Sequence, residues 1–284
     1  MISGVVLVAK PAGPTSHDVV DIVRRALGER RVGHLGTLDP FAQGLLVLVV
    51  GRATRLAPYA GGWEKRYTGV MRLGTTTDTD DGTGSVTQTS DGWQALDAGA
   101  VDAALARFVG RYEQTPPAYS AVKVDGERAY RRARRGEAPA PKARPVDVGE
   151  LVLDQWTPPD ARFHATVSAG TYLRSLARDV GRALGCGGHL VALERTAVGP
   201  FALAEAIAPE AVRPGALQDV ATLVGDLARR DLAPAERDAV AHGRPIAAGE
   251  PAADRVALFA DGVLLAVAER EGDVLKPRVV LVDE

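Results

Sequence analysis

The sequence predicts an α+β chain with a larger first domain and a small β module after it. Runs of branched apolar residues interchange with amphipathic helical patterns over most of the 284 residues. Beyond residue 229, short apolar runs flank an Asp261-Gly262 turn signal, which is typical of a hairpin. The hydrophobic share of 46% is enough for one large core and a satellite domain. We therefore expect domains at residues 1–228 and 229–284.

Composition excludes several classes of protein. A single cysteine, Cys186, excludes a disulfide framework and any multi-cysteine zinc site, and it fits a reducing compartment. The first residues lack the pattern of a signal peptide. No apolar run approaches the roughly 20 residues that a membrane-spanning helix needs. We expect a cytoplasmic protein without a membrane partner.

The distribution of charge says more than the formal net charge of −2. Residues 123–144 contain eight Lys/Arg against three Asp/Glu, a local charge of +5. Residues 205–284 contain nine Lys/Arg against fifteen Asp/Glu, a local charge of −6. Because the local field decides where a polyanion docks, a partner with phosphates stays possible.

The first strand and helix are predicted close to the N-terminus. Gly4 to Ala9 is typical of a short strand, and the stiff turn Lys10-Pro11 follows it. A surface lysine beside a turn is the plainer alternative for Lys10. Ser16 is predicted to cap a helix that ends at Gly28.

The stretch from Gly33 to Gly44 delivers one acid, Asp39, to the edge of the apolar run Leu45–Val50. Its glycines permit tight turns or close approach to a ligand, and Pro40 stiffens the backbone at Asp39. Chemistry is often placed in such polar loops on core elements. The alternative is that Asp39 only hydrogen-bonds its own turn.

Several elements are expected between this loop and residue 110. A helix start at 51–56 would bring Arg52 and Arg55 near the loop, and an alternating strand covers Thr68 to Leu73. The polar loop 74–82 holds three acids, but its spacing does not match an EF-hand, so we expect no metal there. An exposed excursion and a helix over 101–109 follow.

The segment from about residue 114 to 145 combines the basic cluster with Tyr119 and Tyr130. Cations neutralise phosphates and aromatic rings stack on bases, so this composition indicates an element that grips RNA. A solvated charged helix is the alternative. The local charge of +5 in a chain of net negative charge favours the RNA-binding interpretation.

Strands are expected over 146–156, 163–168 and 191–199, and a helix after Gly170 carries Arg174 in its first turn. Its apolar stripe comprises Leu173, Leu176, Val180 and Leu184. Residues 185–190 are predicted to be a flexible break in which His189 is a loop histidine and Cys186 a small buried residue. A helix near 215–227 and the short strands of the β module complete the chain.

Six short motifs follow one another along the chain. They are Lys10-Pro11 with Gly13, Gly33-His34-Leu35-Gly36-Thr37-Leu38-Asp39-Pro40 with Gly44, Lys65-Arg66-Tyr67, Leu73-Gly74 with Thr77-Asp78-Thr79, Gly170-Thr171-Tyr172-Leu173-Arg174-Ser175, and Gly185-Cys186-Gly187-Gly188-His189-Leu190. With these motifs the chain resembles the tRNA pseudouridine-55 synthases of the TruB type over nearly its whole length. Leu35, Phe41 and Leu173 are conservative departures from the family pattern.

The resemblance implies a long mixed, mainly antiparallel sheet flanked by helices, with a C-terminal module of PUA type. It implies isomerisation of uridine 55 in the tRNA T-loop to pseudouridine, without metal, nucleotide or other cofactor. Asp39 matches the catalytic aspartate, Tyr67 the tyrosine that packs on the target base and takes a proton, and Arg174 the arginine paired with the aspartate. Matches around the site are His34 at the space left by the flipped base, Lys10 at the floor, Asp78 and Tyr172 as polar supports, and Leu193 as a wall residue.

The chemistry of the reaction agrees with these residue types. A carboxylate can attack C1′ of the ribose or abstract a neighbouring ribose proton, and the sequence leaves both routes open. An ion pair would keep Asp39 ionised against desolvation. The target base must be flipped out of a folded loop, at a cost of a few kcal/mol. Backbone contacts that offset this cost are expected from Arg52, Arg55, Arg131, Arg132, Arg134 and Arg135.

The expected partner is the T-stem and T-loop of tRNA, bound by a monomer. A second hypothesis is a tRNA-binding or tRNA-folding protein in which isomerisation is secondary or lost. The presence of Asp39, Tyr67 and Arg174 together favours the enzyme, because a protein that only binds tRNA does not need all three residues. A third hypothesis is a relative that depends on a guide RNA. The basic segment disfavours this hypothesis, because it could bind the RNA substrate without a guide.

Overall fold

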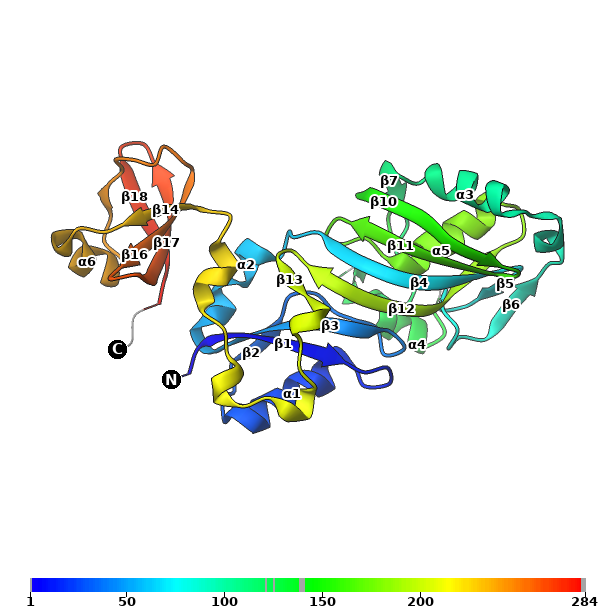
Figure 1. Cartoon of the computed structure of the whole chain (residues 1–284), viewed down its shortest axis with the longest axis horizontal. Helices are drawn as coiled ribbons and strands as arrows, with labels where there is room; N and C mark the ends of the chain where they lie inside the picture. The colour runs from blue at the N-terminus through cyan, green and yellow to red at the C-terminus, as the bar shows by residue number, and fades with distance from the viewer. Residues whose placement is uncertain (1, 121, 125, 138–140, 282–284) are drawn as a thin grey trace.

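The computed structural model describes residues 2–120, 122–124, 126–137 and 141–281. A nine-stranded mixed sheet forms its centre, in the order β1-β3-β12-β4-β11-β10-β7, with β2 added to β3 and β13 to β12 (Figure 1). Among the described strands of this sheet, only β3 and β12 pair in parallel, so the predicted mainly antiparallel α+β fold is confirmed. The strands are β1 (Gly4–Lys10), β2 (Val32–His34), β3 (Gln43–Val50), β4 (Lys65–Leu73), β7 (Gly110–Gln114), β10 (Arg144–Thr157), β11 (Asp160–Val167), β12 (Gly188–Val198) and β13 (Phe201–Ala202).

The parallel junction between β3 and β12 requires a glycine. Gly44 lies opposite Arg195 in the register of the two strands and has a φ of 105°. A Cβ at Gly44 would lie 2.4 Å from the carbonyl oxygen of Arg195, which no other residue could accommodate. The two strands therefore approach each other closely at the end of the loop that carries Asp39.

Helices cover the sheet and bury its apolar residues. Valines of α1 pack against β1 and β3, and α5 contributes Leu173, Leu176 and Val180 to a second core cluster, as predicted. Leu184 follows α5 and is half-buried. The helices and 3-10 turns of this domain are α1 (Ser16–Leu27), η1 (Gly51–Leu56), α2 (Ala57–Ala60), η2 (Gly92–Ala95), α3 (Ala98–Ala106), α5 (Leu173–Ala183), η3 (Leu203–Glu205), η4 (Pro209–Ala211), η5 (Pro214–Ala216) and η6 (Val220–Val224).

The cap of α1 differs from the prediction. Thr15, not Ser16, is the N-cap: its side chain accepts from the Asp18 amide, and the Asp18 carboxylate accepts from the Thr15 amide. This reciprocal pair is a capping box. Ser16 is instead buried in the first turn, which frees its hydroxyl for a tertiary contact. Gly28 ends the helix in the left-handed conformation, as predicted.

Two smaller excursions leave the large sheet. Strands β5 (Thr75–Thr77) and β6 (Val86–Thr89) form a hairpin whose second strand is exposed, in agreement with the prediction of an exposed region. Between β7 and β10 the chain forms β8 (Lys123–Val124), β9 (Glu127–Arg128) and α4 (Ala129–Arg134). These last three elements belong to the basic segment.

The helix predicted near 215–227 is wrong. That region holds the short 3-10 turns η5 and η6, and between them Gln218 pairs with Val5 of β1 through two backbone hydrogen bonds of 2.7 and 3.0 Å. Pro214 and Gly215 interrupt a helical run. Pairing with the edge of the sheet therefore decides the local conformation.

The C-terminal β module is a second sheet in the order β14-β16-β17-β18-β15. Asp261 and Gly262 both have positive φ, of 51° and 80°, as a tight hairpin turn demands, so the predicted hairpin is confirmed. Figure 1 shows the module at one end of the molecule, beside α2. Its elements are β14 (Ala228–Asp231), α6 (Pro234–Ala241), β15 (Ile246–Ala247), β16 (Arg255–Ala260), β17 (Val263–Glu271) and β18 (Val274–Val280).

Arg52 and Arg55 hold this module rather than approach the Asp39 loop. Arg52 donates to the carbonyl of Leu281 at 3.1 Å, and Arg55 donates to that of Val280 at 2.7 Å. The prediction that both side chains lie near the loop is therefore wrong, while their contacts to RNA stay a prediction. Across the described residues, each helix is too short or too polar to cross a membrane.

Candidate active site

Asp39 lies in the loop between β2 and β3, and its side chain is 34% exposed. The loop backbone is fixed at this point, since the carbonyl of Asp39 accepts from the Ala42 amide at 3.1 Å and that of Pro40 accepts from the Gly13 amide at 2.7 Å. The carboxylate is thus open to a ligand while its main chain is tied down. The alternative that Asp39 only bonds its own turn does not describe this side chain.

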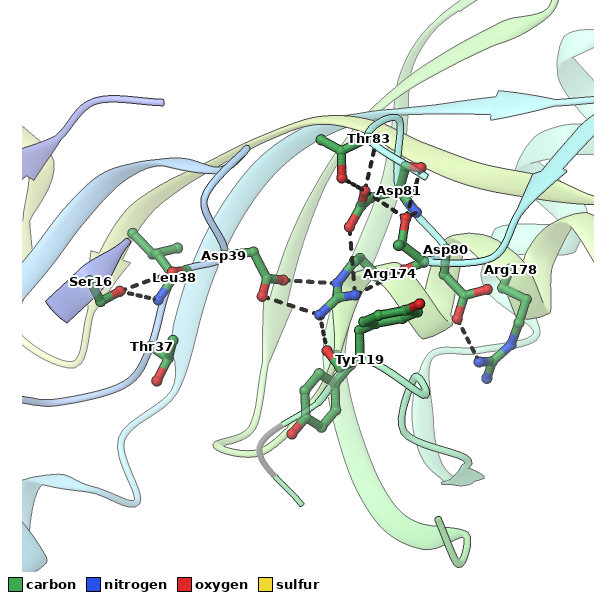
Figure 2. Close-up of polar contacts among 12 residues, drawn as sticks. Ser16, Thr37, Leu38, Asp39, Asp80, Asp81, Thr83, Tyr119, Arg174 and Arg178 are labelled. Carbon is green, nitrogen blue, oxygen red and sulfur yellow. Dashed lines mark hydrogen bonds and ion pairs between the residues drawn. The ribbon is translucent and has the colours of Figure 1, made fainter. Parts of the chain in front are cut away.

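Arg174, in the first turn of α5, makes a bidentate ion pair with Asp39. Its Nε lies 2.8 Å from Oδ2, and its Nη2 lies 3.1 Å from Oδ1 (Figure 2). The arginine side chain is 5% exposed, so the pair lies at the boundary between the interior and solvent. Two parallel hydrogen bonds fix both distance and orientation. The ion pair predicted between these residues is confirmed.

The guanidinium of Arg174 also joins two other segments to the site. Its Nη1 donates to the carbonyl of Thr79 at 2.9 Å, and its Nη2 donates to the carbonyl of Tyr119 at 2.9 Å. The same Nη1 lies 3.5 Å from Oδ2 of Asp81. One side chain therefore connects the Asp39 loop, the turn after β5 and the start of the basic segment (Figure 2).

Asp81 is an acid beside Arg174 that the sequence did not single out. It is 4% exposed, and its Oδ1 accepts from the Thr83 amide, the Thr83 hydroxyl and the Thr79 hydroxyl at 2.9, 2.6 and 2.8 Å. Asp78, the predicted support, is exposed and accepts from the Ser85 amide at 2.8 Å. Three acids within one polar loop look alike in sequence, and the turn alone determines which one faces Arg174.

A second ion pair steadies α5 one turn further along. Arg178 Nη1 lies 2.9 Å from Oδ2 of Asp80, and its Nη2 donates to the carbonyl of Thr115 at 2.8 Å. Burial raises the pKa of Asp80, and the adjacent guanidinium opposes that shift. Within the described residues, no group of three His, Cys, Asp or Glu side chains could hold a metal ion.

Tyr67 and Leu193 belong to the apolar surroundings of the loop. Tyr67, on β4, is 7% exposed and lies opposite Arg195 of β12, while Leu193 lies opposite Gly69. Both share a core cluster with Leu38, the residue before Asp39. A buried phenol beside apolar side chains suits a site from which water is excluded.

Lys10, the last residue of β1, is bonded to the end of the Asp39 loop, and its role at the floor of the site stays a prediction. Its buried Nζ donates to the carbonyls of Ala42 at 2.7 Å and Pro11 at 2.9 Å. Burial lowers the pKa of Lys10 to about 8; the charge of Arg195 adds to this shift and that of Asp39 opposes it. The plainer alternative, a lysine exposed on the surface, is wrong.

The comparisons with known proteins agree with this geometry. Residues 24–173 match the N-terminal domain of the TruB family of pseudouridylate synthases, and residues 174–237 match the tRNA pseudouridylate synthase B C-terminal domain. The chain belongs to the TruB family of pseudouridylate synthases. It is therefore an enzyme of that class, and the resemblance seen in its motifs is confirmed.

Relatives of this TruB-family chain extend over its whole length. Proteins named tRNA pseudouridine synthase B from Thermobifida fusca (strain YX) and Arthrobacter sp. (strain FB24) are 45% and 44% identical, covering 99% of this chain and 99% and 97% of their own lengths. The crystal structure of a Cbf5-Nop10-Gar1 complex contains a chain 26% identical, with a TM-score of 0.74 over 98% of this chain and 84% of that one. A chain in the structure of an H/ACA RNP bound to a substrate RNA containing 2′-deoxyuridine, 23% identical, has a TM-score of 0.73 over 99% of this chain and 85% of that one, which shows the fold alone.

His34 is the residue of β2 next to the Asp39 loop of this TruB-family protein. His34 ends β2, and its ring lies 6.2 Å from that of exposed His17 in an edge-on arrangement. Burial lowers the pKa of His34, which favours the neutral imidazole. His189 is farther along in β12, buried, with Nδ1 2.8 Å from the carbonyl oxygen of Thr75. The prediction that His189 is a loop histidine is therefore wrong, whereas Cys186 is buried as expected.

Tyr172 directly precedes α5, and its backbone is held on both sides. Gln114 of β7 accepts from the Tyr172 amide at 2.8 Å and donates to its carbonyl at 3.2 Å. Arg144 lies 5.1 Å from the centre of the Tyr172 ring and donates to the carbonyl of Gly170. These contacts fix the backbone where it enters the helix that carries Arg174, and the role of Tyr172 as a polar support stays a prediction.

Two arginines of the basic segment, Arg132 and Arg135, pair with acids of the same segment. Arg132 lies 2.7 Å from Glu137, and Arg135 lies 2.7 Å from Glu127 and 2.8 Å from Glu137. Arg131 is exposed. The side chain of Arg134, also predicted to contact phosphates, lies outside the described part of the structure. These contacts to RNA stay a prediction.

Proposed function

We propose that this TruB-family enzyme converts uridine 55 in the T-loop of tRNA to pseudouridine, with Asp39 as the catalytic group. The observation that carries the proposal is the bidentate pair between Asp39 and Arg174, which holds an accessible carboxylate in one orientation. The names of the relatives, tRNA pseudouridine synthase B, support tRNA as the substrate.

Isomerisation requires the uracil to leave C1′ of the ribose, rotate and bond again through C5. Asp39 either attacks C1′ or removes a proton from the ribose, and both routes need an ionised carboxylate within contact of the sugar. Arg174 compensates the loss of water around that charge. The 34% exposure of the Asp39 side chain leaves room for the sugar on the side away from Arg174.

Tyr67 is proposed to stack on the base and accept the proton that C5 loses. Tyr67 is 7% exposed and belongs to a largely apolar cluster with Leu193, which suits stacking against an aromatic base. To accept that proton the phenol gives its own hydroxyl proton to N1 of the rotated uracil, so the net change is a proton shift from C5 to N1. The chain's own residues supply every role in this scheme, without a cofactor.

Extraction of the uridine from its loop costs a few kcal/mol, which contacts elsewhere must offset. The first residues of the basic segment contact the site, because the carbonyl of Tyr119 accepts a hydrogen bond from Arg174. We propose that Arg131, Arg132, Arg134 and Arg135 contact phosphates of the T-stem and T-loop. The enzyme acts as a monomer in the cytoplasm in this proposal.

The test is release of tritium from C5-labelled uridine in an unmodified tRNA transcript, with no guide RNA or second protein added. Asp39→Asn keeps the shape of the side chain and removes its charge, so turnover should fall by more than about 10³-fold while tRNA affinity changes only a few-fold. Asp102→Asn, an exposed position on α3, is the matched control and should turn over normally. A transcript with cytidine at position 55 should release no tritium from other uridines.

Turnover by Asp39→Asn would show that Asp39 is misassigned. Tight binding of the transcript by the wild type without any tritium release would favour the alternative of a tRNA-binding protein. Activity that appears only after addition of a guide RNA would favour the third hypothesis.

A further inference from the structure

Arg195 of β12 is a fully buried cation whose hydrogen bonds all end on backbone carbonyls. It is 0% exposed, and no described carboxylate forms an ion pair with it. Its Nε donates to the carbonyl of Leu45 at 2.8 Å, and its Nη2 donates to that of Gly36 at 3.0 Å. Its Nη1 lies 3.4 Å from the carbonyl oxygen of Thr37. A buried charge is costly unless its donors are satisfied, and here the loop that carries Asp39 satisfies them.

Glycine makes this contact possible. Gly36 has a φ of 110°, and a Cβ built there would lie 3.4 Å from Nη1 of Arg195 and 3.2 Å from Cε of Lys65. A larger residue would be strained in its backbone and would press on the guanidinium. The loop therefore passes directly over Arg195, three residues before Asp39.

Ser16 of α1 holds the next residue of the loop. Its hydroxyl accepts from the Leu38 amide and donates to the Leu38 carbonyl, both at 2.9 Å, and the side chain is 2% exposed (Figure 2). Both polar groups of one peptide residue are thus satisfied by a single side chain. Because Thr15 provides the helix cap, this contact is separate from the capping of α1.

We propose that Arg195 and Ser16 are positioning residues that fix the Asp39 carboxylate by holding the three preceding residues of its loop. The proposal rests on the proposed function, in which Asp39 is the catalytic group. Neither side chain touches the carboxylate, so their effect passes through the backbone. A displacement of the reacting group by about 1 Å can cost about 10²-fold in rate.

The chain contains a matched control for each residue. Arg270 of the C-terminal module also donates to three carbonyls, those of Gly249, Pro251 and Ala253, at 2.8, 2.8 and 3.3 Å. Thr15 lies next to Ser16, stabilises the same helix and makes its side-chain contacts with Asp18. Both controls weaken local structure without a contact to the Asp39 loop.

The experiment compares Arg195→Lys and Ser16→Ala with Arg270→Lys and Thr15→Ala in the full chain. It measures the melting temperature, the dissociation constant for tRNA and the single-turnover rate at saturating tRNA. We expect Arg195→Lys to slow the chemical step by about 10- to 100-fold and Ser16→Ala by about 10-fold, with tRNA affinity within about twofold. Each control should lose some thermal stability and keep its rate within about twofold.

A fall in the single-turnover rate at an unchanged dissociation constant supports positioning, with each rate normalised to the amount of folded protein. Rates that follow melting temperature equally in variants and controls would overturn the proposal, as would a raised dissociation constant with an unchanged single-turnover rate. If Arg195→Lys does not fold, Ser16→Ala against Thr15→Ala decides the question alone. Asp39→Asn is run in parallel: its full activity would overturn the proposed function, whereas its inactivity beside fully active Arg195→Lys and Ser16→Ala would overturn only this inference.

Discussion

Two regions of the molecule serve the proposed substrate, and they are built in opposite ways. In the loop from Gly36 to Ala42, buried side chains of β1, α1 and β12 hold one backbone carbonyl after another. In the basic segment, Arg132 and Arg135 are bound by exposed acids of the same segment. The buried hydrogen bonds of the first region hold one backbone conformation, whereas the arginines of the second region can exchange their acid partners for another anion.

The difference follows from the dielectric surroundings. Exposed ion pairs contribute about 0–1 kcal/mol, so a phosphate can replace Glu127 or Glu137 at little cost. Buried charge-assisted hydrogen bonds are stronger, and an unmade partner leaves a desolvated charge behind. Chemistry at a sugar carbon needs a carboxylate that does not move, whereas gripping a polyanion needs cations that can change partners.

The largest expected effect comes from breaking the fixed region at Arg174. Lysine offers a point charge and cannot bind Asp39 in a bidentate manner while it also reaches the carbonyls of Thr79 and Tyr119. Arg174→Lys should lower the single-turnover rate by about 10²- to 10³-fold. Arg178→Lys, one turn later on the same helix, is the control and should lose less than about tenfold. Equal losses in the two variants would mean that stability of α5, not the geometry at Asp39, sets the rate.

The next effect tests the exchangeable region. Reversal of Arg131, Arg132 and Arg135 to glutamate should weaken tRNA binding and lower the slope of log affinity against log salt by about 2, at about 0.7 for each lost contact. Filter binding at salt concentrations from about 50 to about 300 mM measures both the affinity and the slope. The rate at saturating tRNA should stay close to that of the wild type. An unchanged slope would contradict the assignment of these arginines to phosphates.

A smaller effect in the opposite direction is expected from the acids of the same segment. Glu127→Gln with Glu137→Gln releases Arg132 and Arg135 from their partners, so tRNA should bind up to about fivefold more tightly at low salt. The gain should disappear at high salt. If affinity is unchanged at every salt concentration, the acids do not compete with RNA for these arginines.

The smallest effect concerns a buried lysine beside the Asp39 loop. Burial lowers the pKa of Lys65 to about 8 from 10.5, so between these values the unfolded chain holds a proton that the folded chain has lost. Stability contributed through this group therefore rises with pH in that window, and below pH 8 the cost of the buried charge is fully present. Relative to Lys65→Met, the wild type should gain roughly 1 kcal/mol for each pH unit between 8 and 9.5.

Denaturant unfolding at pH 7.5, 8.5 and 9.5 measures this gain. Lys276→Met removes an exposed lysine of the C-terminal module and should show no comparable change with pH. Parallel pH profiles for wild type and Lys65→Met would contradict the assignment of a lowered pKa to Lys65.

Much of the site was predictable because local signals and global structure agree there. The stretch from Gly33 to Gly44 combines glycines, Pro40 and one acid before an apolar run, and Arg174 stands in the first turn of an amphipathic helix. The pairing of the two residues, 135 positions apart, followed from the resemblance and not from their spacing. The predictions that failed involve polar residues whose partners come from distant elements.

Ser16, Arg52 and Arg55 illustrate why these predictions failed. A serine before a helix is typical of a cap, yet Thr15 takes that position and Ser16 binds Leu38. Arginines that follow a glycine-rich loop in the sequence suggest a position beside it, yet Arg52 and Arg55 donate to the C-terminal module. In each case the side chain has several possible partners, and the choice depends on which element packs beside it.

The sequence by itself determined the α+β class and the β hairpin at Asp261-Gly262, because periodicity and backbone restrictions act over a few residues. The spacing around Asp39 left its role open, and the resemblance of the motifs made it the catalytic candidate. The tertiary structure alone decided that Asp81 rather than Asp78 faces Arg174 and that Arg195 lies under the Asp39 loop. A buried polar group must find its partners wherever the packed chain supplies them. Those partners lie up to 159 residues away, beyond the reach of any local pattern.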